Sequence, residues 1–432
     1  MNLHPPAQAW HEHAGRIGLY ALLLFYQLNA TVAYIGLDLT VLAFLAQAPR
    51  WWPLLRREPV ARLLVVIVLY LLAYAGWAAH EFPASAPAQW MAVGNWLHWL
   101  AFPPVAWQIH ANRRQINWLL ASLAAGLLMR VFTHLQWGQL ADIFHWPRTG
   151  FGYVETVFGP LAGVTALGLL LLAPRCAAAT AWRRLRVGLA LAGLLVALEA
   201  LVLSQTRGAL LAALLVFPLV AAGQYGGWLR RHATLSAKTL TLALVLAVAA
   251  GLFVRQNAGL LADRLQFNAH SVEQLDQRDA ASAPARSIGY RLVLWRIGLE
   301  QWQRRPLLGW GPGSTEMLLR QAAEQALTQA DGSNLYPHLH SHYVEFLVRF
   351  GLLGSLLFAA LPALLLRGVW LAARRGVIPW DYARFLLAGS AFTAIVMAFD
   401  FQIFKFAWRN YCLIWAALGY AVCLDNLTRQ PQ

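Results

Sequence analysis

The chain has 432 residues, of which 59% are hydrophobic and 12% charged, against about 45–50% and about 25% in a typical soluble domain. This composition excludes a soluble globular enzyme, and the 12% of aromatic residues excludes a disordered chain. The net charge of +15 would suggest a nucleic-acid partner for a soluble protein. In so apolar a chain the basic residues are better explained by membrane topology, so we expect an all-α polytopic membrane protein without a nucleic-acid partner.

Apolar runs of the length that a membrane requires recur along the chain. A bilayer core about 30 Å thick needs about 20 apolar residues per helix. Residues 17–47 are too long for one span and are interrupted by Asn29, Thr31 and Asp38, so two short spans are expected there. The other runs are 60–79, 88–109, 115–135, 157–173, 183–203, 207–223, 237–254, 343–366, 379–399 and 408–424. They predict about twelve transmembrane helices, nine in residues 1–254 and three in residues 343–432, which end in a cytoplasmic tail.

Arginine and lysine are concentrated in alternate connections between these runs, as in short cytoplasmic loops. The basic connections carry Arg50, Arg56, Arg57, Arg62, Arg113, Arg114, Arg175, Arg183, Arg184, Arg186, Arg230, Arg231, Lys238, Arg367, Arg374 and Arg375. Residues 1–15 carry Glu12 and several histidines and do not resemble a secretory signal. The pattern predicts that both termini are cytoplasmic and that residues 255–342 lie on the outer, periplasmic side.

The segment 255–342 is far longer than an ordinary connection. Apolar residues recur at helical spacing over 290–304 and 314–328, which predicts two amphipathic helices in this loop. Between them lies the glycine-rich turn Pro306-Leu307-Leu308-Gly309-Trp310-Gly311, where glycine allows close backbone approach. Residues 270–287 are rich in Ser, Ala, Asp and Gln and are expected to be a mobile spacer.

Basic residues on the outer side are unusual and are therefore candidates for a binding site. Arg207 follows the polar break 204–206 and begins an apolar run, so a helix N-terminus would add its N–H groups to the guanidinium and bind an anion. Arg291 lies at the start of the first amphipathic helix, where a cation–π pairing with Trp295 is the alternative. Three further cations near helix ends are candidates for substrate binding, although contact with membrane lipid headgroups is their ordinary role: Arg148, Lys405 and Arg409.

Three histidines precede a predicted span at alternate positions, His338, His340 and His342. A zinc site is disfavoured because alternate residues share a face only in extended backbone, and Glu345 is the only acidic residue or cysteine within five positions. A general base is favoured, since imidazole titrates close to neutral pH. Any of the three histidines, or Glu345, could be that base, and His338 is also a candidate for substrate binding. A backbone-bonded histidine at a helix start is the structural alternative.

Acidic pairs that would hold a metal ion are missing from the sequence. Metal-dependent sugar transferases bind a divalent ion with paired carboxylates, but no Asp-x-Asp occurs, and the nearest pair is Asp276 with Asp279. We therefore expect no metal and no cofactor. Arginine, which binds phosphate with two parallel hydrogen bonds, would then neutralise a phosphorylated substrate.

Several of these motifs occur together in a known order. His340-Ser341, followed after nine residues by Gly351-Leu352-Leu353-Gly354, is similar to the signature of the bacterial O-antigen ligase family. Arg207-Gly208, the pair Arg291 and Trp295, and the turn 306–311 agree with that family in order and spacing. The residue after the histidine is often Asn in the family and is Ser341 here. The superfamily contains O-antigen ligases, O-antigen polymerases and pilin O-oligosaccharyltransferases.

The resemblance implies a GT-C-like glycosyltransferase of the bacterial inner membrane with its active site on the periplasmic side. The donor would be O-antigen polysaccharide on undecaprenyl diphosphate, and the acceptor a sugar hydroxyl of lipid A-core in lipopolysaccharide biosynthesis. Transfer would be inverting and independent of metal. His340 matches the family's proposed general base, while Arg207 and Arg291 match two essential arginines that would bind the diphosphate.

Two kinds of alternative remain. An O-antigen polymerase or a protein O-oligosaccharyltransferase of the same superfamily would share the donor and the arginines. A transporter or flippase would also have many spans and outer cations, but it predicts ionisable residues deep inside the spans. Only Asp38 and Glu199 fit that description, and Glu199 lies near a helix end. The sequence therefore favours a ligase.

Overall fold

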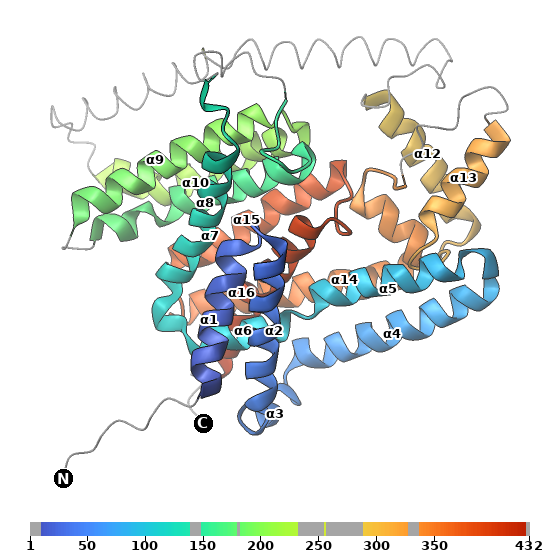
Figure 1. Ribbon diagram of the computed structural model, residues 1–432, viewed down its shortest axis with the longest axis horizontal. Coiled ribbons are helices and arrows are strands. Elements are labelled where there is room, and N and C mark those ends of the chain that lie inside the picture. Colours follow the sequence, from blue (N-terminus) through green and yellow to red (C-terminus); the bar gives the residue numbers. More distant parts are fainter. Residues whose placement is uncertain are drawn as a thin grey trace.

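The fold is all-helical in a computed structural model, which describes residues 10–138, 148–178, 182–231, 255, 288–326 and 337–428. Within these ranges the regular elements are helices, and no strand is among them (Figure 1). Eight of these helices are long and apolar enough to cross a membrane, and the bent pair of α2 (Ala30–Ala46) and α3 (Ala48–Leu55) is a ninth candidate. The prediction of an all-α polytopic membrane protein is confirmed.

The N-terminal apolar stretch forms a helical hairpin, as expected from its length. α1 (Trp10–Phe25) and α2 (Ala30–Ala46) are separated at Asn29, whose side chain caps α2 by accepting a hydrogen bond from the N–H of Val32 at 3.1 Å. The remaining helices of this half are α3 (Ala48–Leu55), α4 (Pro59–Glu81), α5 (Ala86–Leu100), α6 (Phe102–Ala111), α7 (Ile116–His134), α8 (Glu155–Ala178), α9 (Arg183–Leu203) and α10 (Arg207–Arg231).

The predicted single span 88–109 is wrong, because two helices occupy it. α5 ends at Leu100 and α6 begins at Phe102. Pro103 and Pro104 follow at once, and proline has no N–H to continue the hydrogen bonding of a preceding helix, whereas it fits the first turn of a new one. The apolar composition alone could not show this break.

The C-terminal half contains the two amphipathic helices and three long apolar ones. α12 (Ile288–Arg304) and α13 (Thr315–Ala326) agree closely with the predicted ranges. They are followed by α14 (His342–Arg374), α15 (Trp380–Phe399) and α16 (Phe406–Thr428). The predicted span 237–254, the spacer 270–287 and the pair Asp276 and Asp279 lie outside the described residues, so the total of twelve spans stays a prediction.

α14 is interrupted at Gly351, whose backbone is left-handed with φ 59° and ψ −166°. The turn 306–311 packs against this break, backbone to backbone. The N–H groups of residues 310–311 donate to carbonyl oxygens before the break, both at 2.9 Å, and those of residues 352–353 donate to the start of the turn at 2.8 and 3.1 Å. A side chain at Gly351 would overlap the backbone of the turn. The two glycine-rich motifs are therefore halves of one contact.

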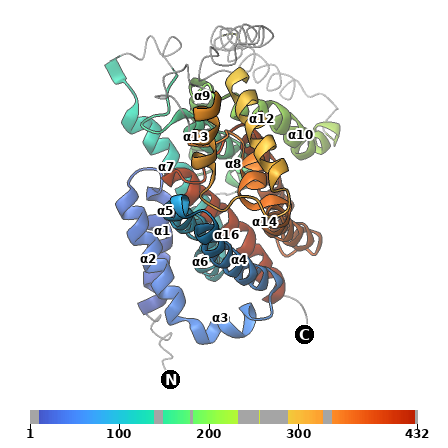
Figure 2. The ribbon, with the colours of Figure 1, turned by 90° about the vertical axis from the view of Figure 1, so that its right-hand side faces the viewer.

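The basic connection that contains α3 lies at the end of the molecule away from α12 and α13. Figures 1 and 2 place α3, the start of α1 and the end of α16 at this end, and α12 and α13 at the opposite end. Ion pairs join Arg50 to Glu12 at 2.6 Å, Arg113 to Asp425 at 3.3 Å and Arg175 to Asp381 at 2.7 Å. Three of the arginines predicted to be cytoplasmic are thus paired with carboxylates, and the side of the membrane on which they lie stays a prediction.

Asp38 and Glu199 are not the only ionisable residues within spans, since Arg130, Glu345, Arg349 and Asp425 are buried in helices that could cross a membrane. Arg130 of α7 is 6% exposed. Its guanidinium lies 3.4 Å from the ring centroid of Tyr153 and donates to the carbonyl oxygen of Gln27 at 2.5 Å. Arg130 stands one turn before the end of α7, so these contacts join that helix end to its neighbours.

Candidate active site

A cavity of about 350 Å³ brings most of the predicted site residues together. Its walls come from the starts of α8, α10 and α12, the end of α15, the residues before α14 and the connection 400–405. It lies at the start of α8, the end of α15 and the start of α16. The other ends of these three helices carry the ion pairs of Arg175 with Asp381 and of Arg113 with Asp425. Six of the seven predicted residues line it: Arg148, Arg207, Arg291, His338, His340 and Lys405.

Arg207 is the first residue of α10, and the connection before it is firmly held. The hydroxyl of Thr206 donates to the carbonyl oxygen of Glu155 at 2.8 Å, and the Nε of Arg148 donates to the carbonyl oxygen of Ser204 at 3.0 Å. Arg148 also lies 3.9 Å from the Glu155 carboxylate. The N-terminal end of a helix carries a partial positive charge, so the Arg207 guanidinium and the start of α10 favour an anion together.

Arg291 reaches the same cavity from the first turn of α12. One turn further along, the Trp295 ring packs beside Phe399 at the end of α15, with 6.5 Å between ring centroids. This contact seats α12 against α15. The charge of Arg291 is close enough to contribute to the lowered pKa of Asp400.

His340 is paired with a carboxylate that follows the end of α15. Its Nδ1 lies 3.1 Å from Oδ1 of Asp400, and Gln402 donates to the other carboxylate oxygen at 2.8 Å. Burial acts to raise the pKa of Asp400, but the hydrogen bond and charge of His340, with the charges of His338 and Arg291, hold this pKa well below its ordinary value. Asp400 is therefore ionised near neutral pH. When Nδ1–H of His340 donates to it, Nε2 carries the lone pair that can accept a proton.

The two other candidate bases do not line the cavity. His342 is the first residue of α14, is 3% exposed, and has its Nδ1 2.6 Å from the backbone oxygen of Asp400. Glu345 is fully buried and accepts three hydrogen bonds from other parts of the protein. The geometry thus leaves His340, with His338 beside it, as the imidazoles that face a substrate.

His338 faces the cavity next to His340, with 4.3 Å between the ring centroids. Burial lowers the pKa of His338 to about 4, and the charge of His340 acts in the same direction. At neutral pH this imidazole is therefore uncharged. A neutral ring can both donate and accept hydrogen bonds, which suits contact with sugar hydroxyls.

Arg409 is the one predicted site residue that does not line the cavity. It lies one turn after Lys405 in α16, where its guanidinium bonds to the side chain of Asn95 and to the Tyr34 hydroxyl at 3.2 Å. These contacts join α16 to α5 and α2. These structural contacts explain the presence of Arg409 at this helix end, with no need for a role in substrate binding.

Among the described residues, one cluster has the spacing of metal ligands: His338, His340 and Asp400, whose ligand atoms lie within 4.8 Å of one another. The surrounding charge opposes a cation. The same cavity is lined by four basic side chains and two carboxylates, and like charges repel strongly where water is partly excluded. The electrostatics therefore favour an anion in this cavity.

Chelation provides a direct test. If the site performs the metal-independent glycosyl transfer that the motif resemblance implies, removing divalent ions with EDTA from the purified protein is expected to leave the initial rate unchanged, because basic side chains would neutralise the charge. The rate is measured with lipid-linked donor and purified acceptor, and a magnesium-dependent glycosyltransferase assayed in parallel serves as the positive control. A rate that disappears with EDTA and returns with one metal ion would contradict the expectation.

Sequence reasoning gave no role to Asp400 or Gln402. Asp400 could not be paired with His340 from the sequence, since the two lie 60 positions apart. The signal present is local: polar residues alternate with aromatic ones in Asp400-Phe401-Gln402, directly after a span. Alternation of this kind marks a segment with one polar face, although it does not identify what that face contacts.

The fold and the cavity together define a polytopic membrane protein with a cationic, histidine-containing site at one end. Residues 192–359 match the O-antigen ligase family model, a range that includes Arg207, Arg291, His340 and Gly351-Leu352-Leu353-Gly354. This match supports the O-antigen ligase family and confirms the resemblance in the motifs. It supports an enzyme of the O-antigen ligase or polymerase type. No curated protein sequence matches the chain.

Proposed function

We propose that the chain is an O-antigen ligase, which transfers polysaccharide from undecaprenyl diphosphate to a sugar hydroxyl of lipid A-core. The observation that carries the proposal is the position of Arg207, Arg291 and His340 on the wall of one cavity. Two arginines and a histidine that come from three separate segments supply an anion site and a base within reach of one substrate. The family match supports the same type of reaction.

The donor's diphosphate is the anion that the arginines would bind. Guanidinium groups bind phosphate oxygens with two parallel hydrogen bonds. Negative charge builds up on the diphosphate as it leaves, and fixed cations stabilise such charge most effectively in a site with little water. Arg207 and Arg291 would hold the two phosphates, with Arg148 and Lys405 adding to the positive potential.

The acceptor hydroxyl would be activated by His340. As its oxygen bonds to the anomeric carbon of the donor sugar, the hydroxyl proton passes to Nε2 of His340, and the electron pair of the broken carbon–oxygen bond leaves with the diphosphate. Attack from the side opposite the leaving group inverts the anomeric centre. Asp400 keeps the imidazole oriented and stabilises its protonated form.

The membrane orientation is part of the proposal. Short basic loops stay in the cytoplasm, and the ion-paired arginines Arg50, Arg113 and Arg175 lie at the end opposite the cavity. This supports a GT-C-like enzyme in the inner membrane with cytoplasmic termini and a periplasmic active site, where it would meet both lipid-linked substrates.

Deletion of the gene distinguishes ligase from polymerase. Loss of a ligase is expected to leave finished polymer on the lipid carrier and lipid A-core without polysaccharide. Loss of a polymerase would instead leave core capped by a single repeat unit. The two results are separated by gel electrophoresis of lipopolysaccharide and by extraction of lipid-linked polymer, with the wild-type gene supplied on a plasmid as the control. Capped core would replace the ligase proposal by the polymerase, and normal lipopolysaccharide would contradict both.

A further inference from the structure

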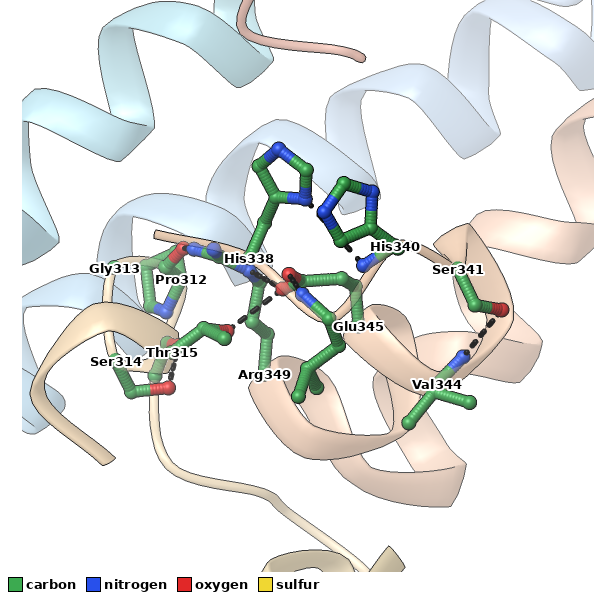
Figure 3. Close-up of polar contacts among 12 residues, drawn as sticks. Pro312, Gly313, Ser314, Thr315, His338, His340, Ser341, Val344, Glu345 and Arg349 are labelled. Carbon is green, nitrogen blue, oxygen red and sulfur yellow. Dashed lines mark hydrogen bonds and ion pairs between the residues drawn. The ribbon is translucent and has the colours of Figure 1, made fainter. Parts of the chain in front are cut away.

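A buried ion pair lies next to residues 337–341, which carry His338 and His340 and are called the histidine segment below. The carboxylate of Glu345 and the guanidinium of Arg349 are one helical turn apart on α14, with 2.6 Å between Oε2 and Nε. Glu345 is fully buried and Arg349 is 3% exposed. Figure 3 shows them between Thr315 of α13 and the segment that carries His338 and His340. An ion pair removed from water in this way is unusual and requires several compensating hydrogen bonds.

The Glu345 carboxylate collects donors from separate parts of the chain. Besides Arg349, the hydroxyl of Thr315 donates to Oε2 at 2.7 Å, and the backbone N–H of Leu339 donates to Oε1 at 2.7 Å. Thr315 is the first residue of α13 and Leu339 immediately precedes His340. One carboxylate therefore connects the start of α13 to the residues that carry His338 and His340.

Arg349 extends the same network to the other walls of the site. Its guanidinium donates to the backbone oxygen of Pro312, at the end of the glycine-rich turn. It also lies over the ring of Phe401, 5.2 Å from the centroid, and Phe401 follows Asp400 directly. The network thus touches three segments: the turn, the histidine segment and the segment that carries the carboxylate partner of His340.

The backbone of His340 needs such support. Its φ of 53° is in the left-handed region, which a residue with a side chain adopts only where the surrounding structure holds it. The N–H of Leu339, fixed by Glu345, belongs to the residue just before this strained position. Ser341, just after it, caps α14. Both neighbours of His340 are therefore anchored, and Glu345 provides the first anchor.

We propose that Glu345 is a positioning residue for the transfer reaction. Through the N–H of Leu339 it holds His340 in its left-handed conformation. Through Thr315 and Arg349 it couples that conformation to the packing of α13 and of the glycine-rich turn. The inference rests on the proposed function, because it assigns to His340 the role of base. Glu345 itself does not contact the cavity.

The test uses nearly isosteric changes, since a small residue at 345 would leave a cavity in addition to removing the carboxylate that pairs with Arg349. Glu345→Gln keeps the volume but places an amide NH₂ where one carboxylate oxygen accepted hydrogen bonds. Thr315→Val removes one donor and keeps the shape, whereas Thr315→Ser restores the hydroxyl. Glu316→Gln is the matched control, because Glu316 is exposed on the same helix and pairs only locally with Arg320.

Backbone hydrogen exchange, followed by mass spectrometry on the purified full-length protein, measures whether the N–H of Leu339 is protected, without any activity assay. Glu345→Gln is expected to increase deuterium uptake in peptides that contain residues 337–341, because the one remaining oxygen stays with the donors Arg349 and Thr315 and the N–H of Leu339 then faces an NH₂ group. Uptake in Glu316→Gln is expected to equal that of wild type. Unchanged uptake in Glu345→Gln would overturn the proposed anchor, whether or not the protein is a ligase.

Kinetics then test the link to catalysis. A misplaced base lowers kcat, so Glu345→Gln is expected to lower kcat by about 100-fold with little change in the KM for the lipid-linked donor, which the arginines hold. Thr315→Val is expected to lower kcat by about fivefold, and Thr315→Ser to restore it. If Glu345→Gln lowered only the amount of folded protein while kcat stayed at the wild-type value, or if wild type transferred no sugar, the positioning role would be overturned.

Discussion

Replacing His340 by alanine is expected to lower the rate of glycosyl transfer by about 10²- to 10⁴-fold, the usual contribution of a positioned general base. A sugar hydroxyl is a weak nucleophile until its proton is removed. His340 is the imidazole that both lines the cavity and has its Nδ1 3.1 Å from an ionised carboxylate. Without it, the donor still binds to the arginines, so kcat is expected to fall much more than the KM for the donor rises.

The measurement is transfer by purified variants in detergent or vesicles, normalised to the amount of inserted protein. His80→Ala is the matched control, because His80 lies at the end of α4, does not line the cavity and is expected to be dispensable. His340→Ala should insert and accumulate like wild type, since His340 lies before α14 and outside the spans. Normal transfer by His340→Ala would show that another group takes the proton.

The helices that could be predicted are those whose signal is local. A span of about 20 apolar residues or an amphipathic period is contained in one stretch of sequence, and for this reason 290–304 and 314–328 correspond to α12 and α13. Breaks were predicted less well. Asn29 signalled the α1–α2 turn through its capping side chain, but the division at Ala101 depends on prolines inside an otherwise apolar run.

The cationic part of the site could also be predicted, because positive charges are rare in the outer connections of membrane proteins. Arg207 and Arg291 stood out as positive charges on the side of the membrane where such charges are rare. The carboxylate partner could not be found in this way. Asp400 acquires its role only when the end of α15 packs beside the residues before α14, a contact between positions far apart in the chain.

The choice among the histidines and Glu345 shows the same limit. The residue types alone left all four open as the base, although the motif match favoured His340. Burial separates them, since His342 and Glu345 are turned into the protein while His338 and His340 face the cavity. The backbone at His340, just before α14, is in the left-handed region. No periodicity rule anticipates one such residue.

Arg207→Lys tests whether the site recognises a diphosphate by shape as well as by charge. The substitution keeps the positive charge at the start of α10 but replaces a planar group with several fixed donors by a single ammonium. We expect transfer to fall by about 10²- to 10³-fold, comparable to the loss of one donor that stabilises transition-state charge. The KM for the donor should rise as well, because the guanidinium also binds the diphosphate before reaction.

Arg320→Lys is the matched control: Arg320 is exposed on α13, forms a local pair with Glu316 and is expected to tolerate lysine. Both variants are assayed over a range of salt concentrations. If charge alone held the donor, Arg207→Lys would transfer at nearly the wild-type rate, and rising salt would weaken donor binding in both proteins equally. If planar, two-bond recognition matters, the defect of Arg207→Lys persists at low salt, where electrostatic attraction is strongest, and a wild-type rate under those conditions would contradict the assignment of Arg207 to the diphosphate.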